Sequence, residues 1–251
     1  MTLTGVPAGF STVTPTLSVV EIERLITFAK EAFGAVETHR TTGSAGGLHS
    51  WLRIGDSMLM CFGAPARGQQ RLHALHVYVP DTDAVYRRAV EAGAESIYVP
   101  EDKPYGERQA GVKDPAGNLW FIATRFAGTP VLEGMRTVTP YLHANNALGL
   151  IEFLKQAFSA REEGVYKTPD GKVMHAALRV GDAVLELGET EAMPTSFYLY
   201  VADADALYRQ AVDAGAKPLV PLADQPWGDR GGAVDDPWGN TWFIATHRAG
   251  S

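Results

Sequence analysis

The chain repeats itself over nearly its whole length, and this repeat limits the possible folds more than any other feature. The tetrapeptide Thr-Val-Thr-Pro occurs at residues 12–15 and again at 137–140. The longest match joins residues 104–124 to 226–246. Each copy of it contains a Gly-Glu-Arg or Gly-Asp-Arg tripeptide, an Asp-Pro-x-Gly-Asn turn and a Trp-Phe-Ile-Ala-Thr strand. The 251 residues are therefore two copies of one unit.

A short segment rich in turn-forming residues separates the two copies. Gly128, Pro130 and Gly134 interrupt any regular structure there. We therefore predict an N-terminal domain at 1–126, a linker at 127–136 and a C-terminal domain at 137–251.

Within each copy, the spacing of hydrophobic residues changes in a fixed order between the alternation of a strand and the period of a helix. In the first copy an alternating strand precedes an amphipathic helix at 21–33, and three short strands follow it. The same order then begins again with a strand at 73–79 and a helix that Gly93 ends. The chain is thus expected to be an α+β protein of four βαβββ modules. The predicted strands that follow the two helices lie at 35–41, 48–54, 57–63, 95–100, 107–114 and 118–124.

Charge and cysteine content exclude several classes of function. A net charge of −7 argues against nucleic acid or an anionic membrane as the partner. Cys61 is the single cysteine, so neither an intrachain disulfide nor a cysteine-rich zinc site is expected. No apolar run approaches the roughly 18 residues of a membrane span, and the start lacks the basic region of a secretion signal. A cytoplasmic protein with a small-molecule ligand is expected.

The repeated motifs resemble those of the glyoxalase, bleomycin-resistance and dioxygenase superfamily, the vicinal oxygen chelate proteins. The resemblance is carried by the Gly181-Asp182 hairpin, the strand-helix stretch 201–216 and the ending from Trp227 to Asn240. It implies tandem domains whose βαβββ modules form curved mixed sheets around clefts, with helices on the convex side. Modules of this family pair within one domain or across domains, and the sequence leaves both pairings open.

The resemblance also indicates where a metal would be bound. Metal-using members carry ligands on the first, fourth, fifth and eighth strands of a module pair. Of the residues at these positions only Glu186 is a plausible ligand, so no metal and no cofactor are predicted. A two-residue shift of the strand alignment would bring in His76 as another ligand. The aligned residues are Thr14, Met60, Ala74, Phe121, Thr139, Glu186, Ser196 and Phe243.

Strand alternation predicts which side chains line the clefts. They are mostly aromatic, with sulfur and a few polar groups, as in a site for a flat or apolar molecule. Two structural alternatives remain: Arg230 forms salt bridges with nearby acids, and His175, which matches His49, bonds within the scaffold. The predicted ligand-binding residues are Tyr141, His175, Tyr200, Trp227, Arg230, Phe243, Trp51, Met60, His76 and Phe121.

Glu186 is the predicted catalytic residue, because it stands in an otherwise apolar strand where the first copy has Met60. Among Tyr141, Tyr198 and Phe243 its carboxylate would be desolvated and suited to proton transfer. His143 and Tyr198 are the predicted partner acids. The alternative is an ion pair between Glu186 and Arg179 on the neighbouring strand.

Three functions follow from this interpretation. The leading one is a binder that sequesters an aromatic or apolar small molecule in a metal-free cleft, as in the family's antibiotic-resistance branch. The second is a metal-independent isomerase, lyase or cyclase with Glu186 as the base. A metal-dependent glyoxalase or extradiol dioxygenase is disfavoured. Since the fused copies can complete a pseudo-dimeric pairing within one chain, a monomer is expected.

Overall fold

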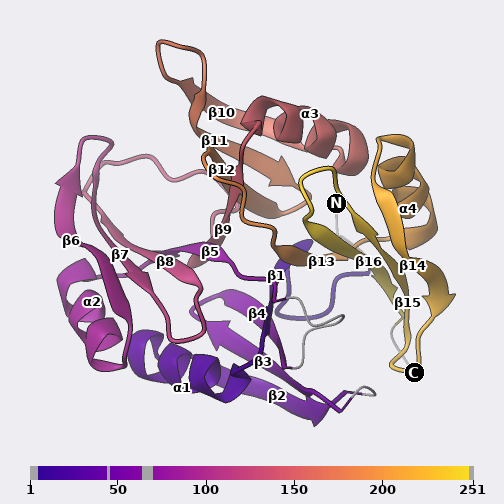
Figure 1. Ribbon diagram of the computed structural model, residues 1–251, viewed down its shortest axis with the longest axis horizontal. Helices are drawn as coiled ribbons and strands as arrows, with labels where there is room; N and C mark the ends of the chain where they lie inside the picture. Colours follow the sequence, from indigo (N-terminus) through magenta and orange to yellow (C-terminus); the bar gives the residue numbers. More distant parts are fainter. Residues whose placement is uncertain (1–4, 44–45, 64–69, 249–251) are drawn as a thin grey trace. The chain divides into compact units, whose positions relative to one another are not determined.

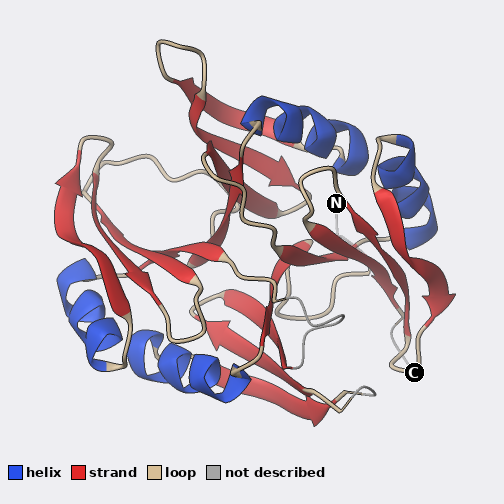
Figure 2. Ribbon diagram, in the orientation of Figure 1, coloured by secondary structure: helices blue, strands red, loops and turns tan. Residues whose placement is uncertain are grey.

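The computed structural model describes residues 5–43, 46–63 and 70–248. Four helices and sixteen strands lie in these ranges, in four consecutive βαβββ modules (Figures 1 and 2). The α+β fold and the modular order expected from the repeat are thus confirmed. No helix in these ranges has both the length and the hydropathy needed to cross a membrane.

The first two modules make up the first copy of the repeat. Module 1 comprises β1 (Val13–Val19), α1 (Ile22–Phe33), β2 (Val36–Thr42), β3 (Leu48–Ile54) and β4 (Ser57–Gly63). Module 2 comprises β5 (Ala74–Tyr78), α2 (Thr82–Glu91), β6 (Glu95–Lys103), β7 (Glu107–Lys113) and β8 (Leu119–Arg125).

The second copy repeats this order. Module 3 comprises β9 (Val138–Ala144), α3 (Ala147–Phe158), β10 (Arg161–Lys167), β11 (Val173–Val180) and β12 (Ala183–Glu189). Module 4 comprises β13 (Ser196–Tyr200), α4 (Ala204–Asp213), β14 (Lys217–Asp224), β15 (Asp229–Asp235) and β16 (Thr241–His247).

The chain divides into two compact units whose ends differ from those of the repeat. The N unit is Thr16–Tyr141, and the C unit is Met1–Pro15 together with Leu142–Ser251. Each unit therefore contains a short segment from the other copy of the repeat. The domain limits 1–126 and 137–251 stay a prediction about the repeat itself.

Strand pairing settles which modules are joined. Val13–Pro15 of β1 pairs antiparallel with β13, and Val138–Tyr141 of β9 pairs antiparallel with β5. The first strand of module 1 is thus bonded to module 4, and that of module 3 to module 2. The two eight-stranded mixed sheets have the orders β14-β15-β16-β13-β1-β4-β3-β2 and β10-β11-β12-β9-β5-β8-β7-β6.

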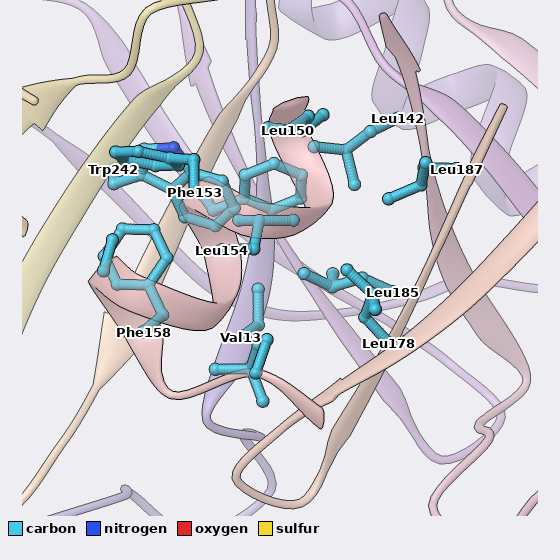
Figure 3. Packing of buried hydrophobic residues seen from close by; sticks show 14 of the residues in the cluster. Val13, Leu142, Leu150, Phe153, Leu154, Phe158, Leu178, Leu185, Leu187 and Trp242 are labelled. Atoms are coloured by element: carbon cyan, nitrogen blue, oxygen red, sulfur yellow. The ribbon is translucent and has the colours of Figure 1, made fainter. Parts of the chain in front are cut away.

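Each unit has its own hydrophobic core between its helices and one face of its strands. In the N unit the core includes Trp120, Ile122, Leu59 and Cys61. In the C unit Trp242 and Ile244 take the corresponding places, and Val13 packs with the residues of α3 (Figure 3). These tryptophans are fully buried, and each indole nitrogen donates to the aspartate of the preceding turn. The two tryptophans therefore lie on the helix side of β8 and β16, as strand alternation predicts.

Candidate functional site

The face of each sheet opposite the helices carries the candidate functional side chains. Successive strand residues alternate between faces, and β13 shows this in the C unit. Phe197 and Leu199 belong to the core beneath the helices, whereas Tyr198 and Tyr200 point the other way. We call this second surface the helix-free face.

An aromatic cluster occupies the helix-free face of module 4. The rings of Tyr198 and Phe243 stack 6.1 Å apart at an interplanar angle of 15°. The Tyr198 ring also lies 4.7 Å from that of Tyr200, which contacts Phe10 edge-on at 5.5 Å. Four aromatic rings from β13, β16 and the N-terminal segment thus form one cluster, the aromatic cluster of the C unit.

A buried carboxylate borders this cluster. Asp229, 4% exposed, accepts one hydrogen bond from the Tyr198 hydroxyl at 2.8 Å and interacts with His247 Nδ1 at 2.9 Å. Burial, together with the nearby Tyr200 and Asp229, raises the pKa of Tyr198, which keeps the phenol protonated as the donor. Trp227 is 61% exposed in the turn before β15, close enough to Tyr198 to lower the pKa of its hydroxyl slightly against the effect of burial. Asp229 therefore fixes a phenol and an imidazole at the border of the aromatic cluster.

The same positions in module 2 hold a different polar cluster. His76 Nε2 lies 3.2 Å from Glu107 Oε1 and 3.2 Å from Gln109 Nε2. All three residues are buried. On the other side of the ring, His76 Nδ1 lies 3.2 Å from the Tyr78 hydroxyl. Glu107 takes the place of Asp229 in the repeat, and His76 takes that of Tyr198.

The structure separates Tyr198 from the other two predicted catalytic residues. Glu186 on β12 and His143 on β9 lie on neighbouring strands, whereas Tyr198 belongs to the other sheet and bonds Asp229. The prediction that Tyr198 and Phe243 surround Glu186 is therefore wrong. It failed because modules 3 and 4, though consecutive in sequence, belong to different sheets.

The side chain of Glu186 is nevertheless buried close to a histidine, as expected of a group that transfers protons. Its side chain is 4% exposed and lies 3.9 Å from His175 Nε2. Leu185 and Leu187 enter the core, so Glu186 is on the helix-free face. Arg179, the alternative partner, pairs instead with Glu163. Burial lowers the pKa of His143, which favours its neutral form.

Arg230 is held away from the helix-free face. Its guanidinium forms two 2.6 Å hydrogen bonds with Asp205 of α4 and one of 3.2 Å with Asp224 of β14. Arg108 makes the corresponding ion pairs with Asp83 and Asp102. The salt-bridge alternative is therefore the correct one, since alternation turns Arg230 to the helix side when Asp229 faces the other side.

The remaining predicted ligand-binding residues lie on helix-free faces of the N unit. Trp51 and Met60 are cross-strand neighbours on β3 and β4, and the Trp51 ring lies 4.3 Å from that of His39. Phe121 is the lateral neighbour of His76 and meets Tyr141 edge-on at 5.8 Å. Tyr141 therefore lies beside β5 and β8, on the face that carries His76.

The donor set at the family's ligand positions does not fit a divalent metal. Met60, Ala74, Phe121 and Phe243 offer a thioether or hydrocarbon where a carboxylate or imidazole is needed. In the described ranges, no three histidine, cysteine or acidic side chains converge. We therefore derive no step that involves a metal.

Sequence reasoning missed Glu107, Gln109, Asp229 and His247. A signal for two of them was present in the repeated Gly-Glu-Arg and Gly-Asp-Arg motifs. Once the arginine is assigned to the helix side, the acid before it must face the other way. The positions of Gln109 and His247 follow from the same alternation, but their partners depend on the packing of neighbouring strands.

Comparison with known proteins gives one family over both copies of the repeat. The family model described as Glyoxalase/Bleomycin resistance protein/Dioxygenase superfamily matches residues 11–122 and 146–244. An uncharacterized protein of Mycobacterium bovis is 38% identical over 122 residues, 43% of this chain and 80% of that protein.

Two solved structures share the fold over most of the chain. Glyoxalase I from Zea mays superposes with a TM-score of 0.73 at 15% identity, over 93% of this chain and 92% of that one. A putative dioxygenase from Bacillus subtilis superposes with a TM-score of 0.64 at 16% identity, over 94% of this chain and 85% of that one. At these identities the likeness concerns the fold alone.

Proposed function

Because the chain belongs to the glyoxalase/bleomycin resistance protein/dioxygenase superfamily, whose scaffold holds small-molecule sites of many kinds, we propose that its C unit binds an aromatic or largely apolar small molecule. The ligand stacks on the aromatic cluster of Phe10, Tyr198, Tyr200 and Phe243. Sequestration, without bond-making, is the resulting function.

The observation that carries this proposal is the pair of parallel rings beside a buried carboxylate. Tyr198 and Phe243 offer a flat apolar surface, since stacked aromatic contacts add to the free energy of apolar burial. Asp229 and His247 supply a few fixed polar groups at its border, which orient a ligand with a hydroxyl or amine donor. A flat aromatic molecule with one donor group fits both features.

Calorimetric titration with 1-naphthol, and with naphthalene as its analogue without the donor, tests the proposal. We expect saturable binding of both and tighter binding of 1-naphthol. Phe243→Ala should weaken binding about tenfold, equivalent to about 1.4 kcal/mol. Phe126→Ala is the control, because Phe126 is 42% exposed and lies outside the cluster. Absence of saturable binding by either compound would exclude this function for the cluster.

Recovery of the ligand after incubation separates sequestration from catalysis. If the protein only binds 1-naphthol, the compound is recovered chemically unchanged, in the molar amount per protein that the titration gives. Light scattering on the same samples measures the mass, for which we expect a monomer of 27.1 kDa.

Acid–base catalysis by Glu186 is the second candidate. It is favoured by the burial of the carboxylate on the helix-free face of β12, 3.9 Å from His175. Glu186→Gln preserves the shape of the side chain and removes its basicity. It should abolish turnover and leave ligand affinity unchanged, and unaltered turnover would contradict the role.

A further inference from the structure

His76 in the N unit has an uncommon pair of neighbours at one ring nitrogen. Glu107 Oε1, which only accepts when ionised, and Gln109 Nε2, which only donates, both lie 3.2 Å from His76 Nε2. The other nitrogen, Nδ1, lies 3.2 Å from the Tyr78 hydroxyl, which both donates and accepts. Both ring nitrogens therefore have a suitable partner with or without a proton.

The orientation of Gln109 is fixed by phenols. The Tyr98 hydroxyl donates to Gln109 Oε1 at 2.6 Å, and the Tyr105 hydroxyl donates to it at 3.4 Å. The amide nitrogen donates to Glu107 Oε1 at 2.9 Å. Burial raises the pKa of Tyr98, so this phenol remains a donor. The amide NH2 group consequently faces His76.

The surroundings of Gln109 are specific to module 2. The Tyr98 ring lies against Gly111, where a Cβ atom would overlap with it. Module 4 has neither the glutamine nor this phenol, and it has a methyl group in place of the hydrogen of Gly111. The corresponding residues there are Val220, Gly231 and Ala233. All three differences between the modules affect the same feature, which is the position of the Gln109 amide beside His76.

These contacts stabilise three states of the imidazole. With the proton on Nε2, the ring donates to Glu107 and accepts from Tyr78. With the proton on Nδ1, it donates to Tyr78 and accepts from Gln109. The imidazolium donates to both Glu107 and Tyr78. A proton can thus enter or leave the ring without the loss of a hydrogen bond, which lowers the cost of proton transfer in a buried site.

We infer that Tyr78, His76 and Glu107 form a proton relay, and that the N unit catalyses proton removal from, and return to, an anionic aromatic carbonyl compound. Tyr78 meets the substrate at the half-buried end of β5. His76 exchanges the proton, and the Glu107 carboxylate stabilises the imidazolium. This activity does not depend on ligand binding by the C unit.

The step conserves protons and electrons. Tyr78 gives its hydroxyl proton to His76 Nδ1 as its oxygen takes a proton from the carbon beside the substrate carbonyl. The C–H bond breaks, its electron pair stays on the substrate as an enolate, and new O–H and N–H bonds form. Tyr78 lies at the half-buried end of β5, where the proton on its oxygen exchanges with water. Return of this solvent proton to the same carbon completes the hydrogen exchange, and protonation of the enolate oxygen gives the enol tautomer. No oxidant or further reactant is needed.

The side chains around Tyr78 suggest the substrate class. The Arg125 guanidinium lies 3.6 Å from the centre of the Tyr78 ring, so an anionic group bound there would lie beside the phenol. Phe121, next to His76, and Tyr141 provide aromatic surface on the same face. The titratable groups that the described contacts place around His76 and its partners are Tyr78, Tyr98, Glu101, Lys103, Tyr105, Glu107, Arg125 and Tyr141.

Two measurements on the full chain test the relay. The first follows the exchange of the C3 hydrogens of phenylpyruvate in D2O by proton NMR. We expect the protein to accelerate exchange over buffer and Tyr78→Phe to reduce the rate at least 100-fold, within the range of general acid–base catalysis. Tyr86→Phe should leave the rate unchanged, because the Tyr86 hydroxyl bonds Ser96 away from the relay.

The second measurement reports the imidazole itself. In protein labelled with 15N-histidine, the ring nitrogens of His76 should show both neutral tautomers. Gln109→Leu should move His76 to the Nε2–H tautomer and shift the pH profile of exchange, since the unprotonated Nε2 loses its donor. Phe243→Ala should alter neither measurement, which separates this site from the C unit.

Three results would overturn the inference. They are an exchange rate no higher than in buffer, full activity of Tyr78→Phe, and a His76 tautomer that is the same with and without Gln109.

Discussion

The carboxylate of Asp229 accepts a 2.8 Å hydrogen bond from the Tyr198 hydroxyl, in the place where the other copy of the repeat sets Glu107 beside His76. The acid is kept in both copies, and the group that it holds has changed from a phenol to an imidazole. One scaffold position thus serves two different chemistries, because the acid at the start of β7 or β15 always faces the central residue of β5 or β13.

Removal of the Asp229 carboxylate should destabilise the protein. In Asp229→Ala the buried Tyr198 hydroxyl loses its acceptor, which should cost about 2 kcal/mol. Urea unfolding monitored by circular dichroism gives this value. Asp224→Ala is the control, because that side chain is 64% exposed and pairs with Arg230 and Arg248. It should change stability by less than about 1 kcal/mol. Equal effects of the two changes would contradict a specific role of the buried carboxylate.

Gly55 should tolerate no side chain, because two separate constraints meet there. Its φ of 57° is in the left-handed region, and an added Cβ would overlap with Thr137 Oγ1. Asp56 in the same turn accepts a 2.7 Å hydrogen bond from the backbone nitrogen of Thr137, so the turn cannot move away freely. Gly55→Ala should therefore destabilise by more than the roughly 1 kcal/mol expected from backbone strain alone.

Gly34→Ala measures that strain by itself. Gly34 has a φ of 67°, and no atom lies within 4 Å of an added Cβ. Thermal unfolding of the two variants should give the larger loss for Gly55→Ala. If both lose the same stability, the contact with Thr137 is not limiting.

Much of the fold could be predicted from the sequence, whereas the grouping of site residues could not. Strand alternation correctly placed Phe121 on the face of β8 opposite the core, where Trp120 is buried, because alternation is a local property. Tyr198 was wrongly grouped with Glu186, because β13 and β12 follow each other in the chain but enter different sheets. Which first strands pair depends on long-range contacts such as the hydrogen bond from the Tyr200 backbone nitrogen to the Thr12 carbonyl oxygen, and no local sequence pattern encodes them.

Arg230→Met should leave ligand binding unchanged. The guanidinium pairs with Asp205 and Asp224 on the helix side of β15, and methionine retains most of the aliphatic packing. Side chains in these ion pairs are 30% to 64% exposed, so the loss of stability should be below about 1 kcal/mol. Calorimetric titration of Arg230→Met and of Phe243→Ala with 1-naphthol, side by side, checks that Arg230→Met leaves the affinity unchanged. If Arg230→Met lowers the affinity as much as Phe243→Ala does, Arg230 takes part in ligand binding.

The pH dependence of stability should contain a contribution from Glu37. Hydrogen bonds from Arg40, Lys30 and Ser50 outweigh desolvation and lower the pKa of Glu37 from 4.5 to about 2. A carboxyl group whose pKa is lower in the folded state stabilises the fold above the unfolded value. That contribution is lost as the pH falls from about 4.5 to about 2. Since Arg40 and Lys30 are each 43% exposed, we expect only roughly 1 to 2 kcal/mol.

Glu37→Gln isolates this contribution. The variant should unfold at lower urea concentration than the wild type at pH 7, and the difference should vanish near pH 2, where Glu37 is half protonated or more in both states. Glu31→Gln on the same unit is the control for the loss of a surface charge. A stability difference for Glu37→Gln that stays constant from pH 7 to pH 2 would show that the carboxylate's charge contributes nothing to the fold.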